Sequence, residues 1–80
     1  VKVKLRFANH LAGVVIDRFG KDTMLIPDGD EHFTVNVDVV PSTHFLAWVF
    51  GFGTEAEILS PESVKDEMKN QLKQLTQMYK

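Results

Sequence analysis

Two stretches of the chain alternate strictly between apolar and polar residues, and this pattern constrains the fold more than any other feature. Residues 1–7 place apolar side chains at odd positions and cations at even ones, and residues 31–40 alternate again after a turn-forming segment. Successive side chains of a β-strand point to opposite faces of its sheet, so each stretch predicts a half-buried strand. The chain is therefore expected to build a sheet with one covered face and one open face.

Turn and cap residues place the other elements in the first half of the chain. Asn9 is expected to cap a helix that runs to about Phe19 and stops at Gly20, because glycine tolerates a left-handed backbone. Residues 22–26 predict a second short strand. The turn-forming segment 27–30 (Pro-Asp-Gly-Asp) then joins it to the alternating strand that follows, as a hairpin.

The second half of the chain predicts a helix, a strand and a final helix. Ser42 is expected to cap a helix over residues 43–50, and residues 56–59 predict a fourth strand. Ser60 as the N-cap and Pro61 at the first helical position predict the start of the last helix. Its apolar residues follow helical spacing and form one stripe: Val64, Met68, Leu72, Leu75 and Tyr79.

The predicted order of elements is strand, helix, strand, strand, helix, strand, helix. Two strand–helix–strand units joined by a hairpin indicate an α+β domain with a ferredoxin-like split βαβ fold (βαββαβ) and an extra C-terminal helix. Eighty residues suffice for one small domain, so residues 1–80 are expected to form a single domain.

Composition narrows the class of protein. The chain has no cysteine, which excludes disulfides and thiolate metal sites, and its apolar runs are too short to span a membrane. We therefore expect a cytoplasmic protein with no membrane partner. Because the first residues already alternate as a strand, without an initiator methionine, we expect the chain to be a piece of a longer protein.

No constellation of residues indicates enzymatic chemistry. Three histidines lie 22 and 12 residues apart, without the spacing of a helical metal site: His10, His32 and His44. Acidic residues at 28–31 and 55–57 fall in the hairpin turn and on an exposed strand face, with no apolar cleft around them. We therefore expect no catalytic residue, no metal and no cofactor.

Three cations at the start of the chain form the candidate ligand-binding site. Lys2, Lys4 and Arg6 are expected to project from the open face of the sheet, each about 7 Å from the next. An extended anion such as a nucleic-acid backbone can pair with them. In the alternative interpretation, they pair across strands with Asp38 or Glu57 or remain solvated. No aromatic residue is expected on that face, which disfavours the base stacking of RNA-recognition sheets.

Three aromatic residues in and after the second predicted helix form the candidate interface. Trp48, Phe50 and Phe52 cluster around eight helical residues, which cannot bury all of them against one small sheet. We expect some of them to face another domain or a second copy of the chain.

The chain resembles a known family, most clearly in its second half. Residues 45–64 carry a helix that ends in the pattern Leu-x-Trp-x-x-Gly-x-Gly, followed by Ala-Glu-Ile-Leu-Ser-Pro and a final helix. This order is similar to the C-terminal extension (WCX-type) domain of bacterial WYL-domain transcriptional regulators. Residues 3–7 and 26–29 resemble the opening strand and hairpin of that family. The matched motif residues look structural: Trp48, Gly51, Gly53 and Pro61.

The resemblance implies a role in transcription regulation. In such regulators a DNA-binding winged helix-turn-helix and a WYL domain precede this extension, so both are expected partners within the parent chain. The family implies that the extension helps to form a homodimer and contributes to the effector-sensing face, with nucleic acids and nucleotides among the candidate effectors. Two alternatives remain open: a pure oligomerisation module, and an ACT-like domain that binds a small molecule on the same fold.

Overall fold

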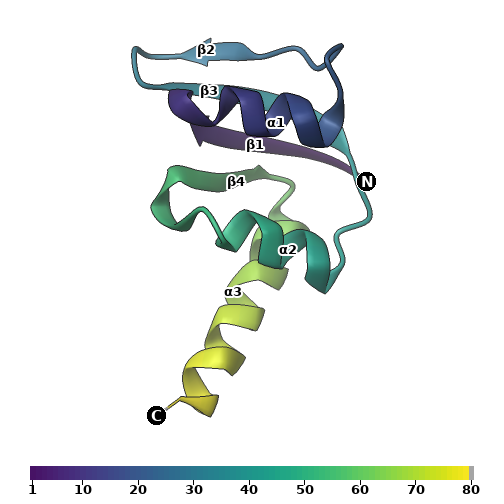
Figure 1. Ribbon diagram of the computed structural model, residues 1–80. Helices are drawn as coiled ribbons and strands as arrows, with labels where there is room; N and C mark the ends of the chain where they lie inside the picture. The colour runs from purple at the N-terminus through teal and green to yellow at the C-terminus, as the bar shows by residue number, and fades with distance from the viewer. Residues whose placement is uncertain (80) are drawn as a thin grey trace.

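A four-stranded antiparallel sheet and three α-helices make up the protein in the computed structural model, which describes residues 1–79 (Figure 1). In chain order the elements are β1 (Lys2–Ala8), the 3₁₀ turn η1 (Asn9–Leu11), α1 (Ala12–Phe19), β2 (Ile26–Asp28), β3 (His32–Asp38), α2 (Thr43–Phe50), the 3₁₀ turn η2 (Gly53–Glu55), β4 (Ala56–Ser60) and α3 (Glu62–Met78). The prediction of an α+β domain is confirmed at this level.

Strand β1 lies inside the sheet, whose strand order is β2-β3-β1-β4. It pairs antiparallel with β3 along its whole length and antiparallel with β4 on its other side. Leu5, for example, lies opposite Val35 on β3 and opposite Ile58 on β4. The first alternating stretch of the sequence therefore occupies the middle of the sheet.

The alternation of β1 separates a covered face from an open face, as predicted. Val3, Leu5 and Phe7 are fully buried, whereas Lys2 and Lys4 are exposed. Helices α1 and α2 lie on the covered face (Figure 1). Their side chains complete the core together with those of β3 and β4: Val15, Phe33, Val35, Phe45, Leu46, Val49 and Ile58. Removing these apolar groups from water is the main contribution to folding.

Helix α2 begins where the sequence predicts. Ser42 precedes it with an extended backbone, and its Oγ accepts a hydrogen bond from the Phe45 backbone N–H at 3.2 Å. This bond satisfies one of the N–H groups that a helix start leaves without a partner. The N-cap prediction for Ser42 is confirmed.

The prediction of a strand at residues 22–26 is wrong. Strand β2 is Ile26–Asp28 and includes Pro27, which the sequence pattern assigned to the turn. β2 lies at the edge of the sheet, where a proline is tolerated because no further strand needs its N–H. Its place is set by the pairing of Ile26 with Thr34 on β3, a contact that local composition does not reveal.

Asn9 does not cap the first helix. It lies in η1, and its side-chain amide donates a hydrogen bond to the Asp30 carbonyl in the hairpin turn at 2.9 Å. Helix α1 begins at Ala12 and ends at Phe19, as predicted for its end, and Gly20 directly after it takes a φ of 103°. A tertiary contact thus replaces the local cap that the sequence predicts.

The start of the last helix also differs from the prediction. Ser60 remains in β4, opposite Lys4, and Pro61 occupies the N-cap position without a side-chain hydrogen bond. Ser60 therefore pairs with β1 as part of β4 and does not cap the helix, although the sequence assigns it to the cap.

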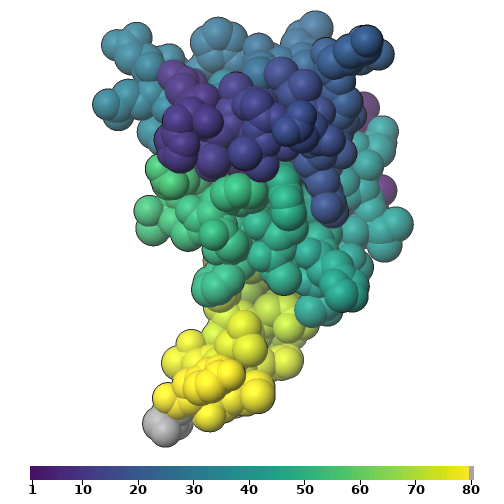
Figure 2. Space-filling model, in the orientation of Figure 1, coloured from purple at the N-terminus to yellow at the C-terminus, as the bar shows by residue number. Residues whose placement is uncertain are grey.

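Helix α3 runs from the sheet away from the rest of the domain (Figures 1 and 2). It has 17 residues and so spans about 25 Å. Only its first part packs against the domain, through Val64 and Met68. No helix among residues 1–79 has the length and apolar character needed to cross a membrane.

Candidate functional site

The open face of the sheet presents Lys2 and Lys4 from the central strand. Both side chains are exposed, and neither forms an ion pair with any of residues 1–79. By strand register, Lys2 lies opposite Asp38, and Lys4 lies opposite Asn36 and Ser60. The two predicted cations are therefore available to an anion, with one acidic neighbour beside Lys2.

Arg6, the third predicted cation, is tied to the three other strands. Its Nε lies 3.2 Å from Asp28 Oδ2 on β2, and its Nη1 lies 3.8 Å from Glu57 Oε1 on β4. Its Nη2 lies 3.5 Å from His32 Nδ1 on β3. The cross-strand alternative thus holds for Arg6 and Glu57, while the contact with Asp28 depends on the shifted position of β2. Partly exposed pairs of this kind contribute about 0–1 kcal/mol each.

The charge balance around Arg6 separates it from the two lysines. Two carboxylates face one guanidinium, so an incoming anion would compete with Asp28 and Glu57 for the charge of Arg6. The Nε–H of Arg6 is buried and not aligned for a hydrogen bond with its carboxylate neighbour, so that contact is one of charge. Arg6 therefore joins the strands of the open face and contributes little free positive charge to it.

No aromatic ring from the strands lies on the open face among residues 1–79. Phe7 and Phe33 stack on the covered side, with ring centroids 5.7 Å apart, and both are buried. A nucleic acid on the open face would therefore meet charges and hydrogen-bonding groups, without rings on which bases can stack.

The histidines and acids do not converge on one centre. His10 pairs with Glu55 between η1 and η2, His32 contacts Arg6, and His44 is exposed on α2. Within residues 1–79, no group of three or more histidine or acidic side chains is arranged to hold a metal ion.

The three predicted interface aromatics separate into two groups. Trp48 is half-buried, and its ring meets three others edge-on, those of Phe7, Phe19 and Phe52. Trp48 and Phe52 therefore pack within the domain. Phe50 is 55% exposed and belongs to no such cluster. Phe50 is therefore the most exposed of the three, and an interface role for Trp48, Phe50 and Phe52 stays a prediction.

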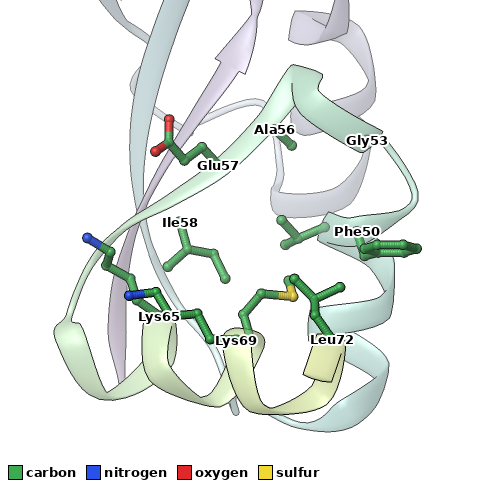
Figure 3. Close-up of a pocket in the computed structure, with 10 residues that line it drawn as sticks. Phe50, Gly53, Ala56, Glu57, Ile58, Lys65, Lys69 and Leu72 are labelled. Carbon is green, nitrogen blue, oxygen red and sulfur yellow. The ribbon is translucent and has the colours of Figure 1, made fainter. Parts of the chain in front are cut away.

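Phe50 lies on a furrow between α2, β4 and α3, which sequence reasoning missed. A hollow of about 250 Å³ opens there, with Lys65 and Lys69 on one side and Phe50 on the other (Figure 3). A smaller hollow of about 80 Å³ continues it between α2 and α3, and the two share Phe50, Met68 and Leu72. The apolar stripe of α3 could have indicated this furrow in the sequence. A 17-residue helix is longer than a small sheet can cover, so part of its apolar stripe has to lie outside the sheet.

One protein family matches the chain. The family model of the WCX domain matches residues 1–76, from the start of the chain into the distal part of α3. No curated protein and no solved structure matches the chain. The family match includes all four strands and hence the whole open face.

Proposed function

The chain belongs to the WCX domain family, and on this premise we propose that it is the non-catalytic C-terminal domain of a bacterial, cytoplasmic WYL-type transcriptional regulator. In this role it senses an anionic effector and contributes to dimerisation. The WYL and helix-turn-helix domains of the parent chain, which precede it, complete the regulator.

The observation that carries the effector role is the pair of exposed lysines on the central strand. Lys2 and Lys4 point to the same face and are about 7 Å apart. Both lack a carboxylate partner among residues 1–79, so an anion can approach them without displacing one. An extended phosphate backbone or a nucleotide suits this arrangement, because its charges repeat along a line.

The lack of rings on this face narrows the mode of binding. Without base stacking, affinity for a nucleic acid would come from phosphate contacts, so it should fall with salt and vary little with base sequence. Arg6 would take no direct part and would keep the strands in register beneath the ligand.

We also assign the arrangement to the ferredoxin-like split βαβ class. The sheet order β2-β3-β1-β4, with antiparallel pairs and two strand–helix–strand units, supports this assignment. In such an arrangement the first strand is central, so its polar residues form the middle of the open face.

Titration with a short fluorescein-labelled single-stranded oligonucleotide tests the effector role. Fluorescence anisotropy at about 50 and about 200 mM salt should give a negative salt slope, to which each lysine–phosphate contact contributes roughly 0.7. The double variant K2A/K4A should lose roughly 10-fold or more in affinity at the lower salt and flatten the slope. A matched double variant on α3, K69A/K73A, removes the same charge elsewhere. It should leave the affinity and the salt slope nearly unchanged.

The alternative of a pure oligomerisation module makes the opposite prediction. If K2A/K4A and K69A/K73A bind the oligonucleotide equally well, or if the chain does not bind it at all, the open face is not the effector surface for nucleic acids. Repeating the titration with mononucleotides then shows whether the chain binds a small anionic ligand in place of a nucleic-acid polymer.

A further inference from the structure

The hollow between α2, β4 and α3 has an apolar floor. Val49 and Ile58 lie at its base and are 2% and 6% exposed. Phe50 of α2 and Met68 and Leu72 of α3 line its sides. A concave apolar surface of this kind gains free energy when an apolar group replaces the water against it, as in most small-molecule sites.

The two ends of this hollow differ in charge. At one end lie Lys65 and Lys69, one helical turn apart on α3, with their amines on the side away from Phe50 (Figure 3). At the other end it continues as the smaller hollow between α2 and α3, which no charged side chain lines within the described residues 1–79. A ligand that matches both ends carries an anionic head and an apolar tail.

The positive charge at the first end is available to such a ligand. Lys69 forms no ion pair with any of residues 1–79. Lys65 lies 3.6 Å from Glu62, a neighbour on the exposed helix surface, and pairs of this kind are weak. Glu57 also lines the hollow, but its carboxylate is shared with Arg6, 3.8 Å away. Two cations therefore face one acid that is already engaged.

The volume sets the size of the apolar tail. An apolar cavity of about 150 Å³ holds a benzene ring, so hollows of about 250 and 80 Å³ have room for roughly 8 to 12 carbon atoms. The smaller hollow is narrow, which suits a straight chain. A folded partner would cover the mouth without filling this recess.

We propose that the hollow binds a medium-chain carboxylate. The straight chain lies along Met68 and Leu72 and enters the recess between α2 and α3, while the carboxylate is held by Lys65 and Lys69. This site is separate from the open face, because α2, β4 and α3 build it and the lysines of the open face belong to β1. It therefore adds a second ligand to the proposed regulatory role.

Calorimetric titration of the chain with octanoate, octan-1-ol and butanoate tests the class of ligand. Octanoate should bind saturably and more tightly than octan-1-ol, which has the same tail without the charge. Butanoate, which has the charge and a shorter tail, should bind at least 10-fold more weakly than octanoate, because it leaves most of the apolar surface uncovered. In ¹H–¹⁵N spectra, octanoate should shift resonances of α2, β4 and α3 and leave those of β3 in place.

Two pairs of variants test the two ends of the site. K65Q/K69Q should weaken octanoate binding roughly 3- to 10-fold and leave octan-1-ol unchanged, whereas K21Q/K73Q removes the same charge outside the hollow and should change neither. Ala47 is exposed and lines the recess, so A47F fills it without disturbing the core and should weaken octanoate at least 10-fold. A47S keeps the recess open and is its control.

The contrary results are equally specific. The proposal is wrong if octanoate does not bind saturably, or if neither K65Q/K69Q nor A47F weakens it. Equal affinity for octanoate and octan-1-ol overturns it as well, because the hollow would then be an apolar contact surface, such as one for another domain of the parent chain. The oligonucleotide titration reports on β1 and is independent of these outcomes.

Discussion

Strand β1 and helix α3 both carry strictly periodic apolar residues, yet only one of them is buried by the domain. Val3, Leu5 and Phe7 on β1 are inaccessible to solvent because β1 has a strand on each side and helices above it. On α3, burial falls along the stripe, from a buried Val64 to an exposed Leu75. Periodicity thus identifies the residues that share a face, and the surrounding elements decide whether that face is covered.

The largest expected difference between the two regions is in how far a leucine-to-alanine substitution lowers the free energy of unfolding. Leu5→Ala should lower the free energy of unfolding by about 2–5 kcal/mol, because it leaves a cavity in the centre of the core. Leu75→Ala in the monomer should change it by about 0.5 kcal/mol or less. Urea denaturation at low protein concentration checks both. Equal losses would mean that distal α3 belongs to the cooperative core, which would contradict the comparison.

Two serines at predicted helix starts sharpen the comparison at the level of single hydrogen bonds. Ser42→Ala should cost about 1 kcal/mol, because its Oγ accepts the Phe45 N–H at the start of α2. Ser60→Ala should cost less, because Ser60 belongs to β4 and caps nothing. Thermal unfolding of both variants gives the measurement. A larger loss of stability for Ser60→Ala than for Ser42→Ala would mean that Ser60 caps α3, as the sequence predicts.

The smallest expected effect concerns the contacts of Arg6 on the open face. Arg6→Met should lower stability by about 1 kcal/mol or less, because its ion pairs with Asp28 and Glu57 are partly exposed. The difference from the unmodified chain should shrink further in high salt, which screens such pairs. Lys2→Met, which breaks no ion pair, is the matched control. A loss for Lys2→Met as large as that for Arg6→Met would show that the ion pairs do not matter.

Local patterns in the sequence were enough to predict the two faces of β1, the cap of α2 by Ser42, the end of α1 at Gly20 and the family. These features depend on residues close together in the chain, since strand alternation, capping and glycine stops act over a few positions. The positions of Lys2 and Lys4 on the open face follow from the same alternation. The placement of these two candidate residues was therefore predictable from the sequence.

Contacts between distant parts of the chain, in contrast, set which of these residues are free and which are engaged. They place β2 at Pro27, so that Asp28 reaches Arg6, and they draw Asn9 to the hairpin turn. They also pack the half-buried Trp48 against other rings, while Phe50 remains exposed on a furrow beside α3. Each outcome depends on partners far away in the sequence, and a local pattern carries no information about what will pack against it.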